Sequence, residues 1–213
     1  LRGGAFKPRT SPYDFQGHGQ KALAILRDVK ARTGMPIVSE IVRESDLDQM
    51  MDVVDILQIG ARNAMNYSLL EAVAGSGKPV LLKRGIAAKI EERLLAAEYL
   101  AKNGNPNVIL CERGIRTFED ATRNTLDISA VPIVKQLSHL PIIVDPSHAA
   151  GKWGLVPPLS KAAVATGADG LIIEVHSHPE DAMSDGAQSL KPSNFSTLMQ
   201  ELKILAKTVG REL

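Results

Sequence analysis

Six short apolar runs, separated by helical patterns, constrain the fold of this chain more than any other feature. Each run is rich in Val, Ile or Leu and reaches a polar or glycine residue at or next to its end; they lie at residues 36–40, 56–60, 79–83, 108–113, 141–145 and 170–175. Short bounded runs of this composition predict strands that are buried on both faces. We expect residues 1–6 to be the end of a seventh strand.

Helical patterns lie between these runs. Apolar residues recur at helical spacing in residues 20–32, before Gly34, in residues 88–102, before Gly104, and in residues 193–206. Strands that alternate with helices predict βαβ units and a parallel sheet. The glycine-rich stretch at residues 75–78 lacks the Ser or Thr of a phosphate-binding P-loop, because Pro79 stands there, and predicts a helix-to-strand turn.

The spacing of the runs distinguishes between parallel folds. Their ends lie 20 to 32 residues apart and continue to the C-terminal part of the chain. This regular βα period favours a (β/α)8 TIM barrel over a doubly wound sheet. With no linker or repeat in the sequence, we expect residues 1–213 to form a single barrel domain.

Charge and composition exclude several classes of partner. The 25 Lys and Arg nearly balance the 24 Asp and Glu, and only 4% of residues are aromatic, which argues against a nucleic-acid or anionic-membrane surface. No run of about 18 apolar residues is present, so no membrane span is expected. One cysteine, Cys111, excludes an internal disulfide, is expected to be buried in a strand, and fits a cytoplasmic protein.

Cationic side chains gather at the expected strand ends. They are Arg2, Lys7, Arg9, Arg62, Lys83, Arg84 and Arg113. In a barrel the C-terminal strand ends form one face, where active sites are built. There the cations would converge on a multiply anionic ligand, since Arg and Lys bind phosphate and carboxylate. The alternative is ordinary solvated surface charge.

A second group of residues has the chemistry of a metal site. His148 lies in the sequence Asp145-Pro-Ser-His, Glu174 ends the next apolar run, and Asp185 follows in a later loop. Imidazole and carboxylate together suit a divalent ion such as Mn²⁺, Fe²⁺, Co²⁺ or Zn²⁺. A lone strand-end histidine is more often an ordinary loop residue, and His176 and His178 compete for the role.

Several motifs, in order along nearly the whole chain, resemble one enzyme family. They are LRGGAFKPRTS at 1–11, QIGARN at 58–63, LKRG at 82–85, CERG at 111–114, DPSH at 145–148 and EVH at 174–176. They are similar to the short microbial type of 3-deoxy-D-arabino-heptulosonate 7-phosphate (DAHP) synthase. The resemblance implies a metal-dependent (β/α)8 barrel that condenses phosphoenolpyruvate with erythrose 4-phosphate and releases phosphate. This is the first step of the shikimate pathway to chorismate and the aromatic amino acids.

The resemblance also implies roles for the cations. Arg62, Lys83 and Arg113 would hold the phosphate of phosphoenolpyruvate, and Arg2 and Lys7 would lie near its carboxylate and reacting carbons. The erythrose 4-phosphate contacts would be Arg9 and Thr10. Because the related octulosonate-phosphate synthases have a different sequence there, the Pro8-Arg9-Thr10 stretch favours the four-carbon aldose.

The remaining roles concern catalysis and the metal. Glu40 or Lys7 would help to activate water, and Asp145 is a third expected catalytic residue. His148, Glu174 and Asp185 would be three of the four metal ligands.

In the family the fourth ligand is a cysteine in a Gly-Pro-Cys motif on the first strand. This sequence opens on what resembles the second strand, so we expect a barrel whose first strand and helix are missing from the chain. Cys111 matches a different position in the family, so it is not expected to be this fourth ligand. No regulatory domain is visible in the sequence, and family members are commonly homodimers or homotetramers.

Two alternatives stay open. One is a sister synthase that uses another phosphosugar, of the octulosonate-phosphate type. The other is a phosphosugar-binding barrel without turnover.

Overall fold

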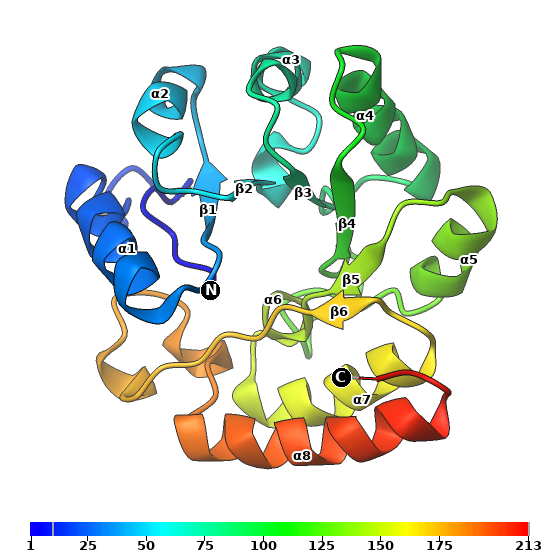
Figure 1. Cartoon of the computed structure of the whole chain (residues 1–213). Coiled ribbons are helices and arrows are strands. Elements are labelled where there is room, and N and C mark those ends of the chain that lie inside the picture. Colours follow the sequence, from blue (N-terminus) through cyan, green and yellow to red (C-terminus); the bar gives the residue numbers. More distant parts are fainter. Residues whose placement is uncertain (10, 213) are drawn as a thin grey trace. The chain divides into compact units, whose positions relative to one another are not determined.

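Figure 1 shows the computed structural model, which describes residues 1–9 and 11–212. The chain divides into two compact units. Unit 1 holds Leu1–Gly85 and Lys89–Ile109. Unit 2 holds Ile86–Ala88 and the chain from Leu110 onward. No helix among the described residues is long and apolar enough to cross a membrane.

Strands and helices alternate along unit 1. Its elements are α1 (Gln20–Thr33), β1 (Val38–Ile41), η1 (Glu44–Asp46), α2 (Leu47–Met50), β2 (Ile56–Ile59), η2 (Ala61–Asn63), α3 (Tyr67–Gly75), β3 (Val80–Lys83), α4 (Ile90–Lys102) and the start of β4 (Val108–Glu112). α1 ends as expected at Gly34, whose left-handed backbone (φ 68°) suits glycine. The turn predicted between α3 and β3 is confirmed.

The strands of unit 1 pair in parallel. Val38 lies opposite Ile56 in the β1–β2 pair, and Leu57 lies opposite Val80 in the β2–β3 pair. All four residues of β3 are buried, as expected for a strand covered on both faces. The opening segment adds only an isolated parallel bridge between Arg2 and Val38.

Unit 2 follows the same alternation. It contains the end of β4 and then α5 (Ala130–Leu137), β5 (Ile142–Val144), α6 (Pro146–Ala150), η3 (Trp153–Leu155), α7 (Val156–Ala165), β6 (Gly170–Leu171), η4 (Pro179–Asp181), η5 (Gly186–Gln188) and α8 (Pro192–Thr208). β4 pairs with β5, and β5 with β6, again in parallel. A buried apolar cluster joins α7 to α8 through Val156, Val164, Leu198 and Leu202.

β6 is shorter than the predicted strand at residues 170–175. Ile172 N–H still donates to Val144 O, the last residue of β5. After Val144 the partner strand β5 ends and α6 begins at Pro146, so β6 has no strand left to pair with there. Glu174 N–H donates to the hydroxyl of Ser147 in α6 at 3.0 Å. The expected strand therefore gives way to a segment that presents Glu174 beside α6.

Candidate metal centre and anion-binding residues

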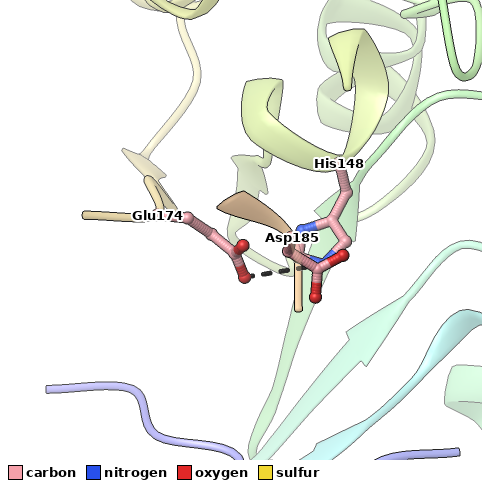
Figure 2. Close-up of side chains that lie close together, drawn as sticks. All are labelled: His148, Glu174 and Asp185. Carbon is pink, nitrogen blue, oxygen red and sulfur yellow. Dashed lines mark ion pairs between the residues drawn. The ribbon is translucent and has the colours of Figure 1, made fainter. Parts of the chain in front are cut away.

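Three side chains of unit 2 converge on one point. His148 comes from α6, Glu174 from the segment after β6, and Asp185 from the residue before η5. Each offers one ligand atom, and these atoms all lie within 4.8 Å of one another (Figure 2). His148 Nε2 is 3.6 Å from Glu174 Oε1. The structure thus brings together the three residues that the sequence predicted as metal ligands.

The orientation of His148 is fixed by Asp145 at the start of α6. Asp145 is fully buried, and its Oδ1 accepts the backbone N–H of His148 at 2.9 Å. Its other oxygen, Oδ2, lies 2.8 Å from His148 Nδ1. A carboxylate on one ring nitrogen favours the tautomer that leaves Nε2 free to bind a metal. Asp145 therefore orients the imidazole ring from the side opposite Nε2.

Asp185 is held in an unusual backbone conformation. It is the one non-glycine residue in the described chain with positive φ (60°). The next residue must be glycine, because a Cβ at Gly186 would lie 2.1 Å from Pro179 O. Strained backbone of this kind clusters at functional sites.

The chemistry and size of this group fit a divalent metal ion. One imidazole nitrogen and two carboxylates suit Zn²⁺ and similar borderline ions, whose bonds to these atoms are about 2.0–2.2 Å. Two ligand atoms on one ion then stand up to about 4.4 Å apart, so only a small closure is needed from the observed separation. Cys111 is fully buried and is not among these ligands in the described part of the chain.

A second cluster, in unit 1, surrounds the carboxylate of Glu40 at the end of β1. Gln58, on β2, donates from Nε2 to Glu40 Oε2 at 3.0 Å. A Cβ at Gly60 would lie only 1.9 Å from Glu40 Oε1, so the carboxylate occupies space that any other residue at position 60 would fill. The position of the Glu40 carboxylate therefore depends on the hydrogen bond from Gln58 and on the absence of a side chain at Gly60.

Burial raises the pKa of Glu40 above its usual value, although nearby charges oppose the shift. The positive charges of Lys83, Arg2 and Arg62 and the Gln58 hydrogen bond all lower it. Desolvation prevails, so the carboxyl group keeps its proton to a higher pH than a free glutamate does. A raised carboxyl pKa of this kind is typical of groups that exchange a proton with a bound ligand.

The other predicted cations differ in burial. Lys83, Arg84 and Arg113 are almost fully buried at strand ends, Arg2 and Lys7 are partly buried, and Arg62 is exposed. Buried cations at strand ends argue against ordinary surface charge.

Arg9 is anchored in the opening loop of unit 1. Its Nε donates to Phe15 O at 2.9 Å. Its buried Nη2 has no hydrogen-bond partner within the described residues, and a buried donor of this kind can be satisfied by an anion. Thr10, the other predicted sugar-phosphate contact, lies outside the described residues.

Three residues that contact these groups were not singled out from the sequence. Gln58 had a signal, because it is a polar residue within an apolar strand run. Arg123 and Gln188 had none, since Arg123 lies in an irregular segment, Gln188 ends the short helix η5, and their contact depends on the tertiary fold.

Comparison with known proteins places this architecture in one family. The DAHP synthetase I family matches residues 1–209. A phospho-2-dehydro-3-deoxyheptonate aldolase of Thermotoga maritima is 60% identical over 99% of the chain, which spans 62% of that relative's length. A 2-dehydro-3-deoxyphosphooctonate aldolase of Geotalea uraniireducens is 34% identical, covering 92% of the chain and 76% of the relative.

Solved structures agree. The crystal structure of the Thermotoga maritima phospho-2-dehydro-3-deoxyheptonate aldolase (DAHP synthase) matches with a TM-score of 0.96 and 58% identity, covering all of this chain and 62% of the other. A truncated form of the DAHP synthase from that organism matches at 0.92 and 55% identity, covering all of this chain and 77% of the other. The predicted parallel α/β fold of the TIM-barrel type is therefore confirmed. The chain belongs to the DAHP synthetase I family.

Proposed function

We propose that this chain carries the catalytic machinery of a DAHP synthase, which condenses phosphoenolpyruvate with erythrose 4-phosphate and releases phosphate. The observation that carries the proposal is the 60% identity to the Thermotoga maritima phospho-2-dehydro-3-deoxyheptonate aldolase along nearly the whole chain. The convergence of His148, Glu174 and Asp185 supports it independently. In this role the protein would act in the cytoplasm at the start of the shikimate pathway.

The cations are proposed to bind the first substrate. Arg2, Arg62 and Lys83 already place positive charge around Glu40, and Arg113 is a buried cation at the end of β4. Phosphoenolpyruvate carries a phosphate and a carboxylate, and such groups are bound by Arg and Lys. Neutralising both charges would hold the substrate in position for attack, a contribution from orientation and electrostatics.

Arg9 and Thr10 are proposed to bind the second substrate, and Lys7 is proposed to lie near the carboxylate and reacting carbons of phosphoenolpyruvate. Arg9 and Thr10 would contact the phosphate of erythrose 4-phosphate, and the buried Nη2 of Arg9 is a donor suited to it. Glu40 or Lys7 would assist the water that adds beside the new carbon–carbon bond. Because burial raises its pKa, Glu40 holds a proton more readily than an exposed glutamate does, which suits a group that accepts and returns that proton.

His148, Glu174 and Asp185 are proposed to hold a divalent ion, of Mn, Fe, Co or Zn. A bound ion would supply Lewis-acid polarisation of the aldehyde oxygen. Asp145 is proposed to contribute through His148, because it contacts both the backbone N–H and Nδ1 of that residue. We also propose that residues 1–213 belong to one catalytic domain and that the protein assembles as a homodimer or homotetramer.

The aldose is tested by comparing erythrose 4-phosphate with arabinose 5-phosphate as partners of phosphoenolpyruvate. The product is identified by mass spectrometry. We expect the seven-carbon product and little reaction with the five-carbon aldose. Preference for arabinose 5-phosphate would indicate an octulosonate-phosphate synthase, which relatives at about a third identity represent. Ligand-induced stabilisation without either product would indicate a binding protein.

A further inference from the structure

A chain of hydrogen bonds lies behind the two carboxylates of the candidate metal centre. Arg123 Nη1 donates to Asp185 Oδ1 at 3.2 Å and to Gln188 Oε1 at 2.8 Å. Gln188 Nε2 in turn donates to Glu174 Oε2 at 3.2 Å. One guanidinium nitrogen and one amide therefore connect Asp185 with Glu174.

The amide of Gln188 can point only one way in this chain. An arginine donates and never accepts, so the amide oxygen must face Arg123 and the NH₂ group must face Glu174. Gln188 is only 2% exposed, which leaves it little freedom to turn toward solvent. Because Oε2 of Glu174 is held by Gln188, its other oxygen, Oε1, faces His148 Nε2.

Arg123 is itself fixed to the helix that carries His148. Arg123 N–H donates to Ala150 O, and the side chain of Asn124 donates to His148 O at 3.0 Å. The approach is close, since a Cβ at Gly151 would lie 2.6 Å from Arg123 Cβ. Arg123 and Asn124 thus reach all three candidate ligands. Asn124 bonds to the backbone of His148, and Arg123 bonds to Asp185 directly and to Glu174 through Gln188.

We propose that Arg123 and Gln188 are positioning residues that preset the Glu174 and Asp185 carboxylates for a divalent ion. The proposal rests on the proposed metal site. A free carboxylate loses rotational freedom when it binds an ion, whereas one already held by a donor loses less. Outer hydrogen-bond partners of this kind commonly contribute 10- to 100-fold to metal affinity.

Orientation and charge predict opposite effects for Arg123. If the guanidinium acted mainly as a positive charge near the ion, its removal would tighten metal binding. The Arg123 side chain is 37% exposed, so solvent screens this repulsion. The Asp185 carboxylate is only 12% exposed and depends on the donor more strongly. We therefore expect loss of Arg123 to weaken binding.

The test measures Mn²⁺ affinity of the full 213-residue chain by isothermal titration calorimetry. Arg123→Met removes the guanidinium, and Gln188→Met removes the amide at similar volume. Lys152→Met is the matched control: Lys152 lines the same pocket of about 370 Å³ as Arg123 and Gln188, but its Nζ donates to Ala121 O. Thermal unfolding without metal reports whether each variant folds like the unchanged chain.

We expect Arg123→Met and Gln188→Met each to weaken Mn²⁺ binding about 10- to 100-fold, while Lys152→Met binds like the unchanged chain. The visible spectrum of bound Co²⁺, which reports ligand geometry, should change in both test variants and stay the same in the control. Should Gln188→Met not fold, the half-exposed Arg123→Met decides alone.

Unchanged or tighter Mn²⁺ binding by a folded Arg123→Met chain would overturn the positioning role and leave the metal site standing. Absence of Mn²⁺ binding by the unchanged chain would instead overturn the proposed metal site, and the positioning role with it.

Discussion

Replacing Gly60 by alanine should displace the Glu40 carboxylate without straining the backbone. Gly60 has φ −70° and ψ 161°, which any residue adopts readily. The added Cβ would lie 1.9 Å from Glu40 Oε1 and 2.7 Å from its Cδ. Glu40 must therefore rotate away, because its side chain is the flexible partner in this contact.

The cost follows from what Glu40 leaves behind. Its departure breaks the 3.0 Å bond from Gln58 Nε2, and Gln58 is only 1% exposed. A buried donor left unsatisfied costs about 1–3 kcal/mol. For a chain of this size, each kcal/mol lowers the Tm by about 2–4 °C, so we expect a decrease of about 2–12 °C.

Thermal unfolding of four proteins tests this reasoning as a double-mutant cycle. They are the unchanged chain, Gly60→Ala, Glu40→Ala and the double variant. Once Glu40 is shortened, the alanine at position 60 has no carboxylate to displace, so Gly60→Ala should cost little in that background. An equal loss of Tm in both backgrounds would refute the proposed clash.

Three further predictions concern charge and metal. The Lys30 hydrogen bond lowers the pKa of Asp55 below 3.8, so its stabilising contribution is present above that pH and is lost as the pH falls through the lowered value; Asp55→Asn should reduce the Tm at neutral pH and lose that difference in acid. Burial raises the pKa of Glu40 above 4.5, so folding becomes less favourable as the pH rises from 4.5 through the raised value. The Tm advantage of Glu40→Gln over the unchanged chain should therefore be larger at neutral pH than at pH 4. A larger advantage at pH 4 would contradict the raised pKa of Glu40. His148→Ala should remove the rise in Tm that Mn²⁺ produces, and an undiminished rise would exclude His148 as a ligand.

Much of the fold was predictable because burial leaves a strong pattern in the sequence. The run at residues 79–83 is apolar up to its terminal lysine and became the fully buried strand β3. α1 was predictable from its apolar spacing and from Gly34. Short helices were not predicted, since α6 has only five residues and α5 contains a proline in its first turn. They form because of contacts made by the folded chain rather than through local propensity.

The candidate metal residues were predictable from their chemistry, but the backbone and the hydrogen-bond partners that hold them in place were not. His148 follows one apolar run and Glu174 lies at the end of another, where a parallel fold brings side chains together. The end of β6 at Leu171 was missed, because its cause is the onset of α6 in a distant part of the sequence. Likewise, nothing near Arg123 in the sequence indicates Gln188, which is 65 residues away.

The most direct test of the proposed function follows phosphoenolpyruvate consumption by this chain with Mn²⁺, with and without erythrose 4-phosphate, and with a chelator control. A metal-dependent DAHP synthase predicts loss of phosphoenolpyruvate that requires the aldose and is abolished by the chelator. Consumption that continues in the presence of the chelator, or no consumption although Mn²⁺ binds, would contradict it.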